Sequence, residues 1–588
     1  MNIFRDLGWF FKQEKRAYII GILLLIAVAL LQLVPPRVIG WAVDAIEKGS
    51  LSKETLLQMV LLLGAAAVGS YGMRYIWRVM IFGAAVKLAR QMRNTLYEHF
   101  TKMNQTFYQS KRTGDLMAHA TNDIQAIQQT AGIGVLTFAD SVITGSVVLI
   151  TMAVTISWKL TLISLLPMPL MAWLTNKYGT MLHQRFGEAQ AAFSSLNDKV
   201  QESITGVKVV KTFGKETSEV DMFTRQSADV VQKNMKVARI DSLFDPTISF
   251  IVSWSFLFAL IFGSRMVVSN EITLGELVTF TTYLGLLVWP MLAFGWLFNI
   301  VERGRASYDR VFALLQEKNE IVESEKPITK RPNGAITVQI DRFVYPGTDE
   351  AALKDIHFSL QEGQTLGIVG KTGAGKTTLL KLLIREFDLT VGDIYFDQHS
   401  IKSYSFDSLY NSIGYVPQDH FLFSTTVGEN IAFSNQNASH SDIERVAQLA
   451  HVHEDITCFT DGYETIVGEK GVSLSGGQKQ RLSIARALLQ DPQMLFLDDS
   501  LSAVDGKTEA LILKSLKQHR RNKTTVITTH RLSAVAHADL ILVIKGGRII
   551  QRGRHEELLK EHGWYQEMYT RQQLEEIVEA GGYEYHEK

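Results

Sequence analysis

The sequence predicts an all-α membrane domain of six long transmembrane helices, followed by a soluble α/β domain. Two observations predict this fold class. Long apolar runs crowd the first half of the chain, and runs of this length cross the roughly 30 Å hydrocarbon core of a bilayer. The second half alternates strand-like and helix-like runs around a glycine-rich stretch, Gly370–Thr377. Length agrees with two domains, because 588 residues exceed the roughly 250–300 at which one core stops growing.

Composition excludes several classes of protein. Basic and acidic side chains balance at 60 each, so charge gives no argument for a nucleic-acid partner, and we expect none. The single cysteine, Cys458, excludes a disulfide or a thiolate cluster within the chain, and we expect it to be a small buried residue. A soluble helical bundle is excluded by the length of the apolar runs.

The membrane domain is predicted to begin with an amphipathic helix over residues 1–16, which lies in the membrane interface. Six spans follow, at about 17–34, 56–83, 133–156, 160–174, 248–268 and 274–300. Pro35 and Pro36 should kink or end the first span. Ser157–Lys159 predicts a tight turn between the third and fourth spans, and Pro290 lies within the sixth.

The connections between spans differ in length and charge. Those after the second and fourth spans, 84–132 and 175–247, are long and rich in Lys and Arg. The positive-inside rule places them and both termini in the cytoplasm of a cell whose plasma membrane the chain crosses several times. Leu196, Val200 and Ile204 keep helical spacing, so we expect the helices to continue beyond the bilayer.

Two acidic side chains lie in or near the spans. Asp140 is within the third span, and Asp245 precedes Pro246 at the start of the fifth. Acidic residues inside a membrane are candidates for binding a ligand or a proton. If the helices extend into the cytoplasm, Asp245 lies instead in water or beside a basic residue. Both roles stay open.

A charged stretch with two prolines separates the halves and predicts a linker. The predicted organisation is a transmembrane domain at 1–315, a linker at 316–334, a nucleotide-binding domain at 335–575 and a polar tail at 576–588.

The glycine-rich stretch reads G-x-x-x-x-G-K-T between the strand-like 366–369 and the helix-like 378–384. Glycines let the backbone N–H groups converge on one point, and the helix adds its positive end. The motif is the phosphate-binding loop of P-loop nucleotide hydrolases, so this half is an α/β P-loop ATPase domain. Its predicted nucleotide-binding residues are Gly370, Lys371, Thr372, Gly373, Ala374, Gly375, Lys376, Thr377 and Thr378. Lys376 should reach the β- and γ-phosphates, and the Thr377 hydroxyl should hold Mg²⁺.

Further motifs follow in a fixed order. Tyr345 precedes the loop, Gln418 closes Tyr-Val-Pro-Gln, Leu474–Gln478 reads Leu-Ser-Gly-Gly-Gln, and His530 follows a strand-like run. Met494–Asp498 is a buried strand that ends in an acid, which places a carboxylate beside the P-loop to hold Mg²⁺. Together with the six spans, these motifs resemble a half-transporter of the ABC exporter superfamily over essentially the whole chain. The resemblance implies the type IV exporter fold, with ATP and Mg²⁺ as cofactors and no exclusion of GTP.

The resemblance also implies a role for each motif. Tyr345 stacks on the adenine ring, Gln418 contacts Mg²⁺, and His530 contacts the γ-phosphate. The signature Leu474, Ser475, Gly476, Gly477 and Gln478 binds a nucleotide held by a second half-transporter. Ser502 and Asp505 lie in a loop that crosses to this partner, and the stretch 465–471 resembles a loop that senses the membrane helices. The coupling segments contain Arg112, Thr113, Gly114 and Asp115 in one stretch and Thr205 and Gly206 in the other.

One position departs from the family pattern. The residue after Asp498 is usually a glutamate that polarises the attacking water, and here it is Asp499, one methylene shorter. A misplacement of about 1 Å can cost roughly a hundredfold in rate. The catalytic set is predicted as Asp499, His530, Gln418 and Lys376, with Asp499 making this site slow.

That departure resembles the degenerate-site half of heterodimeric bacterial multidrug exporters of the BmrC type. It implies a different partner chain that carries the glutamate, a lipid bilayer, and hydrophobic or amphipathic cargo moved by alternating access. The alternatives are a homodimeric exporter of lipid or peptide, and an ATP-gated channel or regulator of the same architecture.

Overall fold

The computed structural model describes residues 2–468 and 474–582. The chain divides into two compact units. The helical unit contains residues 1–102 and 112–317, and the sheet unit contains residues 103–111 and 318–588.

The helical unit is built from long α-helices with three π-helical turns between them. Its α-helices are α1 (Asn2–Asp6), α2 (Gly8–Gln13), α3 (Lys15–Gln32), α4 (Val34–Glu47), α5 (Lys53–Lys102), α7 (Thr113–Ala118), α8 (Ile124–Gln129), α9 (Val135–Met152), α10 (Trp158–Leu165), α11 (Met168–Thr205), α12 (Val207–Thr212), α13 (Glu216–Asp241), α14 (Phe244–Val268) and α15 (Leu274–Gln316). The π-helical turns are η1 (His119–Asp123), η2 (Thr130–Gly134) and η3 (Ala153–Ser157).

Five helical stretches of the described residues are long and apolar enough to cross a membrane. They are Lys15–Glu47, Lys53–Lys102, Thr113–Leu165, Glu216–Val268 and Leu274–Gln316. The stretch predicted as the fourth span, 160–174, is divided between α10 and α11. Helical structure stops at Leu166 and Pro167, because proline lacks the N–H that would continue the ladder.

Several local predictions for the helices are confirmed. The first helix stops at Gln32 and a second starts at Val34, with the two prolines in its first turn. Ser157 interrupts the helix with extended backbone, and its side chain accepts a hydrogen bond from the Leu160 N–H. The extension of helices beyond a bilayer is evident in α5, which runs for 50 residues.

The N-terminal helices differ from their prediction. Residues 2–13 form two short helices, and Ile3, Leu7 and Phe10 among them are fully buried. One helix was predicted over residues 1–16, whereas the described part of this range forms α1 and α2 before α3 begins at Lys15.

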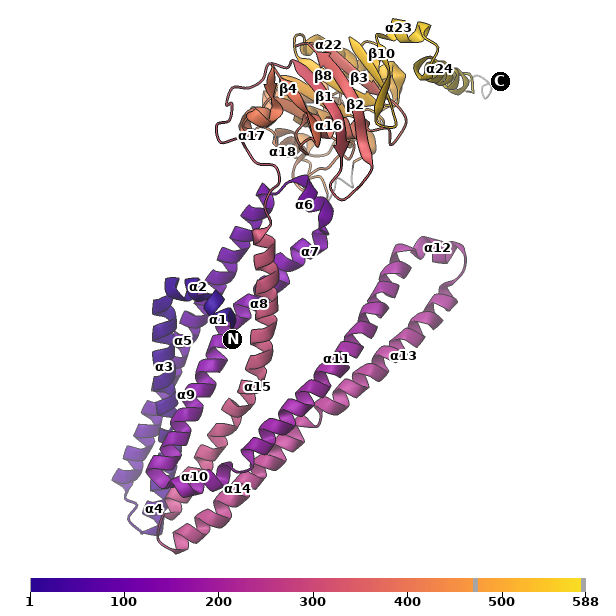
Figure 1. Cartoon of the computed structure of the whole chain (residues 1–588). Coiled ribbons are helices and arrows are strands. Elements are labelled where there is room, and N and C mark those ends of the chain that lie inside the picture. Colours follow the sequence, from indigo (N-terminus) through magenta and orange to yellow (C-terminus); the bar gives the residue numbers. More distant parts are fainter. Residues whose placement is uncertain (1, 469–473, 583–588) are drawn as a thin grey trace. The chain divides into compact units, whose positions relative to one another are not determined.

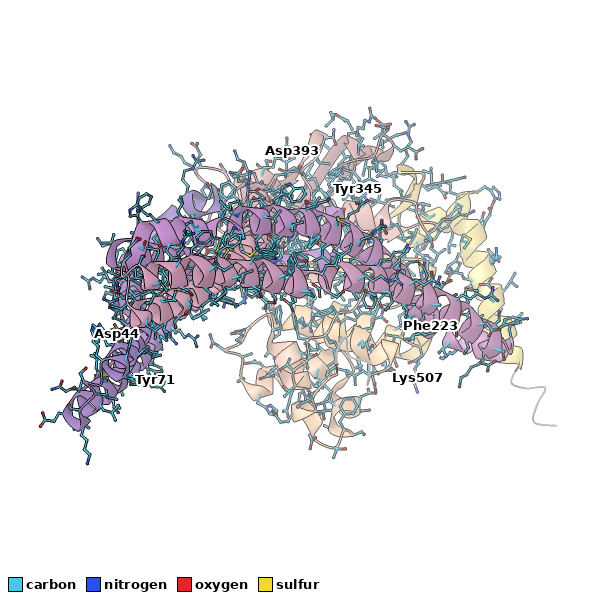
Figure 2. The ribbon with its side chains drawn as sticks, turned by 90° about the horizontal axis from the view of Figure 1, so that it is seen from below. Asp44, Tyr71, Phe223, Tyr345, Asp393 and Lys507 are labelled. Atoms are coloured by element: carbon cyan, nitrogen blue, oxygen red, sulfur yellow. The ribbon has the colours of Figure 1, made fainter. Side chains whose placement is uncertain are left out.

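Two groups of helices make up the helical unit. α11 and α13 run side by side as a long hairpin that α12 closes (Figure 1). This hairpin joins the other helices through α14, which packs on α15, and a shared core contains Met152, Leu160, Ile251 and Phe280. Exposed side chains such as Tyr71 on α5 project from the outside of the unit (Figure 2).

The sheet unit contains two β-sheets. The first has the order β2 (Ala351–Leu360), β1 (Ile336–Val344), β4 (Val391–Phe396) and β5 (His399–Ser400), and its pairs are antiparallel. The second has the order β10 (Arg548–Gly553), β9 (Leu540–Lys545), β3 (Thr365–Val369), β8 (Thr524–Thr529), β7 (Met494–Asp498) and β6 (Ile413–Val416). All its pairs are parallel except β9 with β10.

Short helices surround these sheets. They are α6 (Gln105–Ser110), α16 (Lys376–Leu383), η4 (Ile401–Ser403), α17 (Phe406–Tyr410), α18 (Val427–Ala432), α19 (His440–Leu449), α20 (His453–Thr457), η5 (Gly462–Glu464), α21 (Gly476–Leu489), α22 (Gly506–His519), η7 (Leu532–Val535), α23 (His555–Lys560) and α24 (Trp564–Gly582). α24 continues past residue 576, where the nucleotide-binding domain was expected to give way to a polar tail.

The parallel sheet is buried on both faces, as β7 shows. Leu495 and Leu497 belong to one hydrophobic core, while Met494 and Phe496 belong to the other. Because β3, β6, β7 and β8 are parallel, their carboxyl ends meet at one edge of the sheet. The segments that follow these ends carry the P-loop, Gln418, the paired aspartates and His530.

The linker predicted at 316–334 follows the end of α15 at Gln316. It lies along the sheet unit, where Ile328 pairs with Tyr404 and the Val322 carbonyl accepts a hydrogen bond from Arg385 at 3.0 Å.

Candidate functional site

The glycine-rich loop follows β3 and has the backbone that its glycines allow. Gly370 has φ +153° and Gly375 has φ +106°. A Cβ atom at residue 370 would lie 2.2 Å from the Ile544 carbonyl oxygen, so only glycine fits there. α16 begins at Lys376, two residues earlier than predicted, and its first N–H groups are free of intrahelical partners. The loop and helix together form a cradle for an anion.

Lys376 lies at the centre of this cradle. Its Nζ donates hydrogen bonds to the carbonyl oxygens of Gly370 at 2.8 Å and Lys371 at 3.2 Å. Burial lowers the pKa of Lys376 below its usual 10.5, and the negative charges of Asp499 and Asp498 oppose this shift. A desolvated ammonium group of this kind gains more from a phosphate ligand than a solvated one does.

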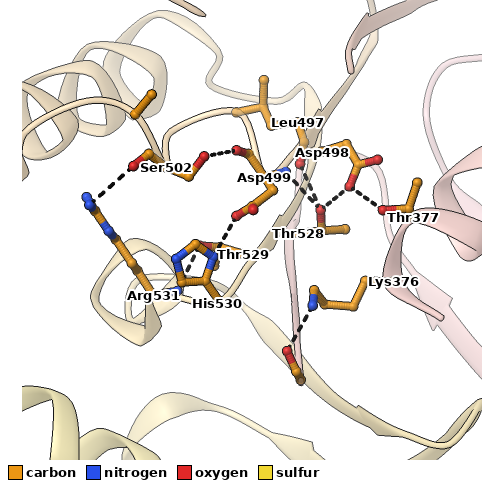
Figure 3. Close-up of polar contacts among 12 residues, drawn as sticks. Lys376, Thr377, Leu497, Asp498, Asp499, Ser502, Thr528, Thr529, His530 and Arg531 are labelled. Carbon is orange, nitrogen blue, oxygen red and sulfur yellow. Dashed lines mark hydrogen bonds and ion pairs between the residues drawn. The ribbon is translucent and has the colours of Figure 1, made fainter. Parts of the chain in front are cut away.

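Asp498 ends β7 as a buried carboxylate, with 1% of its surface exposed. Its Oδ1 accepts hydrogen bonds from the hydroxyls of Thr377 at 3.1 Å and Thr528 at 2.7 Å (Figure 3). Its Oδ2 lies 3.4 Å from the Tyr415 hydroxyl, whose pKa burial raises far above 10. The Tyr415 hydroxyl therefore stays protonated and donates a hydrogen bond to this oxygen.

The Thr377 hydroxyl and the Asp498 carboxylate fit Mg²⁺. Both are oxygen ligands, and Mg²⁺ is usually bound by one or two such protein groups together with phosphate oxygens and water. Within 2–468 and 474–582, no group of three or more His, Cys, Asp or Glu side chains could hold a metal ion. This pair therefore suits a metal that arrives with a phosphate ligand.

Asp499 adopts left-handed backbone, with φ +45°. Its N–H group donates to the carbonyl oxygen of Thr528 at 3.0 Å and to its hydroxyl at 3.1 Å. Its Oδ1 lies 3.0 Å from Nδ1 of His530, the residue after β8 (Figure 3). The short carboxylate is thus already engaged with the imidazole.

The Leu474–Gln478 motif starts α21, whose first residue is Gly476. Ser475 is its N-cap: its hydroxyl accepts from the Gln478 N–H at 3.2 Å, and the Gln478 side chain accepts from the Ser475 N–H at 3.1 Å. Within residues 2–468 and 474–582, the Ser475 hydroxyl has no acceptor for its own proton. Leu474 is buried, which anchors the motif, and Gly476 and Gly477 supply the first N–H groups of a 14-residue helix.

The other predicted residues lie around this centre. The Tyr345 hydroxyl lies 3.0 Å from that of Thr378, and its ring packs edge-on against Phe343 and Phe387. Gln418 is exposed two residues beyond β6. Among the described residues, no hydrogen bond joins the 474–478 motif to the loop at 370–377.

Ser502 and Asp505 lie in the loop between β7 and α22. The Ser502 hydroxyl donates to the Asp499 carbonyl oxygen at 2.9 Å. Asp505 caps α22 by accepting from the Thr508 N–H at 3.0 Å. The loop is thereby fixed next to the paired aspartates.

Sequence reasoning missed two residues that organise the site. Thr528 joins Asp498 to Asp499, because its hydroxyl donates to one and accepts from the N–H of the other. No pattern in the sequence marks Thr528, because it faces Asp498 only through the pairing of β7 with β8 in the folded sheet. Arg531 donates to the carbonyl oxygens of Ser502 and Val504. Its position directly after His530 was an available signal.

The remaining predictions fall in the helical unit or at loops. Arg112 precedes α7, which holds Thr113, Gly114 and Asp115, while Thr205 ends α11 and Gly206 separates it from α12. Of the stretch 465–471, which was predicted to sense the membrane helices, residues 469–471 lie outside the described residues.

Three single residues can also be placed. Asp140 accepts a hydrogen bond at 2.8 Å from Thr144 of its own helix, and Asp245 is exposed. Cys458 is exposed, so its predicted burial is wrong: it follows the short α20 at the surface.

Comparison with known proteins gives matches to both units. The family model "ABC transporter transmembrane region" matches residues 18–291, and the model "ABC transporter" matches residues 353–502. The chain is 47% identical over 580 residues to the probable multidrug resistance ABC transporter ATP-binding/permease protein YheI of Bacillus subtilis (strain 168), with 99% of each chain covered. It is 47% identical to the multidrug resistance-like ATP-binding protein MdlA of Escherichia coli (strain K12), with 98% of each covered. A solved bacterial Atm1-family ABC exporter with ATP bound superposes with a TM-score of 0.81 and 27% identity, over 95% of this chain and 99% of that one.

Proposed function

This chain belongs to the ABC transporter family, as an exporter with a transmembrane region and an ATP-binding domain in one polypeptide, and from that premise we propose that it is one half of a heterodimeric multidrug exporter. It has the type IV exporter fold, lies in a membrane and hydrolyses ATP. The multidrug assignment is supported by the relatives YheI and MdlA, which are named as multidrug resistance proteins.

The heterodimer proposal rests on Asp499. At the position where the family has a catalytic glutamate, this side chain is one methylene shorter, and its carboxylate lies 3.0 Å from the His530 imidazole. A general base must reach its water within hydrogen-bond distance. This chain's own site therefore holds ATP and hydrolyses it slowly, while its intact Leu474–Gln478 motif completes the site of a partner that carries the glutamate.

Within the proposal, the residues at the sheet edge divide the work. Lys376 and the loop N–H groups bind the phosphates, and Tyr345 stacks on the adenine. Thr377 and Asp498 hold Mg²⁺, assisted by Gln418, and this ion neutralises charge on the β- and γ-phosphates. His530 contacts the γ-phosphate.

ATP bound between two chains closes the nucleotide domains, and hydrolysis lets them part. The motion reaches the membrane helices through the segments at Arg112–Asp115 and Thr205–Gly206. The first of these directly follows residues 103–111, which group with the sheet unit. Both termini lie in the cytoplasm, and hydrophobic cargo leaves across the plasma membrane by alternating access.

Co-purification tests the partner. We expect a second, different ABC half-transporter to accompany the tagged chain expressed in its native host. The purified complex in inside-out vesicles should then concentrate a hydrophobic dye against its gradient in the presence of ATP. A complex that hydrolyses ATP but moves neither dye nor lipid would contradict export and favour a channel or regulator. Recovery of this chain alone as an active dimer would favour the homodimer.

Asp499→Glu tests the slow site. In the assembled complex we expect ATPase activity to rise, because the longer side chain brings a carboxylate to the attacking water. The two sites of the complex should then hydrolyse ATP at more similar rates, as measured by trapping nucleotide on each chain. Unchanged turnover and unchanged asymmetry would contradict the role given to Asp499. Asp407→Glu, which makes the same chemical change at an exposed position of α17 away from the site residues, is the matched control.

A further inference from the structure

The C-terminal helix α24 is anchored in the core of the sheet unit by its first two turns. Tyr565 is fully buried, its hydroxyl lies 2.8 Å from Nδ1 of His555, and its N–H donates to the Gln551 side chain at 3.1 Å. Met568 and Tyr569 pack against the same core. Positions 565, 568, 569 and 572 share one face of an α-helix, so Gln572 continues the anchored face.

Gln572 uses both ends of its amide on the segment 530–532. Its Nε2 donates to the His530 carbonyl oxygen at 2.7 Å, and its Oε1 accepts from the Leu532 N–H at 2.9 Å. Leu532 is the first residue of η7, so its N–H has no partner within that helical turn. Two hydrogen bonds from one planar group fix both the position and the direction of the backbone between them.

This backbone carries His530, whose side chain is 52% exposed and has Asp499 as its polar partner. The next residue, Arg531, points to the loop at 502–505, where it donates to the carbonyl oxygens of Ser502 and Val504. Because little protein packs around the imidazole, the position of the imidazole is set by the backbone of His530.

We propose that Gln572 is a positioning residue for the nucleotide site, which holds the backbone of His530 so that its imidazole faces the γ-phosphate. The C-terminal helix then takes part in distinguishing ATP from ADP, although it lies outside every motif of the site. The inference rests on the γ-phosphate contact of His530, and it is independent of the partner and of the cargo.

Binding of two nucleotides to the purified full-length protein tests this proposal. The probes are the Mg²⁺ complexes of ADP and of the non-hydrolysable β,γ-imido analogue of ATP. Binding that is lost in the Lys376→Met variant is assigned to this chain's site. We expect Gln572→Leu to weaken binding of the analogue about tenfold, the loss of one hydrogen bond to a charged group. Binding of ADP, which lacks the γ-phosphate, should stay within about twofold by the same reasoning.

Two further variants separate positioning from general stability. His530→Ala should give the same selective loss, and Gln572→Leu should add nothing to it, because both changes remove one interaction. Gln573→Leu is the matched control, since Gln573 is the adjacent exposed residue of the same helix. Equal losses for both nucleotides, an additive double variant, or no effect of His530→Ala would each overturn the proposal. Failure of dye export would leave it untouched and count only against the proposed function.

Discussion

At the scale of single residues, the site is organised by Thr528 as much as by the acids. Asp498 is buried, and a buried carboxylate needs hydrogen-bond donors to remain charged. Thr528 supplies one at 2.7 Å and also accepts the N–H of Asp499 at 3.1 Å. One hydroxyl thus links the acid proposed to hold Mg²⁺ to the acid at the proposed catalytic position.

Thr528→Val keeps the shape of this side chain and removes its hydroxyl. The Asp499 N–H and the Asp498 carboxylate each lose one of their partners, and the loss of a hydrogen bond to a charged group costs about 1.5–3 kcal/mol. We expect the free energy of unfolding to fall by that amount, and the Mg²⁺-dependent part of ATP affinity to fall about tenfold. Titrations of ATP with and without Mg²⁺ measure the second effect. Thr528→Ser, which restores the hydroxyl, should restore both; equal weakening with and without Mg²⁺ would contradict the account.

The sequence was sufficient for every residue whose chemistry is local. Gly370, Lys376 and Thr377 belong to one motif, and Asp498 ends a strand with a clear apolar pattern. Thr528 and Gln572 were not predicted, because their roles come from pairing with distant parts of the chain. Thr528 faces Asp498 through the register of β7 and β8, and Gln572 reaches His530 across 42 positions.

At the scale of elements, α21 shows one residue with two separable duties. Ser475 caps the helix through the Gln478 N–H at 3.2 Å, and in the proposed function its hydroxyl also donates to a phosphate held by the partner. Ser475→Ala removes both duties, and loss of the cap alone costs about 0.5–2 kcal/mol.

Ser475→Asp separates these duties. Aspartate caps as well as serine does, so thermal stability should stay near that of the unaltered protein, whereas Ser475→Ala should lower it. Its charge repels the phosphate held by the partner, so ATPase activity of the complex should fall at least tenfold. Unfolding curves and turnover of both variants check this. Full activity of Ser475→Asp would mean that the motif meets no phosphate.

In the helical unit, α4 and α15 approach each other closely at two glycines. The Asp44 carboxylate accepts hydrogen bonds from the Gly275 N–H at 2.7 Å and the Thr273 hydroxyl at 2.9 Å (Asp44 is labelled in Figure 2). A Cβ atom at residue 275 would lie 2.0 Å from the Gly40 carbonyl oxygen, so the two backbones leave no room for a methyl group.

Gly275→Ala should therefore separate these helices. Overpacking of this kind costs about 1–3 kcal/mol. We expect a lower unfolding temperature in detergent, together with weaker protection of the α4 amides from hydrogen exchange. Gly64→Ala is the matched control, because a Cβ there meets nothing within 4 Å, and alanine favours a helix by about 1 kcal/mol. A stability equal to that of the control would show that the close approach is absent in solution.

Element prediction succeeded where the signal was strong and failed at boundaries. The strand at Met494–Asp498 was predicted with its observed bounds, and α14 and α15 contain the predicted fifth and sixth spans. The fourth span was not predicted as a helix broken at Leu166 and Pro167, because hydropathy averages over such a break.

At the scale of the whole molecule, the proposed function gives the chain two half-sites, of which one departs from the family pattern and the other matches it. Its P-loop half has Asp499 at the catalytic position, and its signature half is capped and intact. No hydrogen bond joins the two among the described residues, which agrees with the proposal that another chain completes each of them. Unequal half-sites on one chain give unequal complete sites only when the partner is a different protein, since a homodimer would contain two identical composite sites.

Two single variants of this chain distinguish these assemblies. Asp499→Asn removes the carboxylate from this chain's own site, and Ser475→Asp disables its contribution to the partner's site. In the proposed heterodimer, Asp499→Asn should retain most of the ATPase activity, because that site turns over slowly already. Ser475→Asp should retain about a tenth or less, the loss expected for one charge-assisted hydrogen bond. In a homodimer both variants alter both sites, so both should abolish turnover. Steady-state ATPase rates of the purified complex decide between them, and comparable loss in both variants would assign the chain to a homodimer in which Asp499 is the working base.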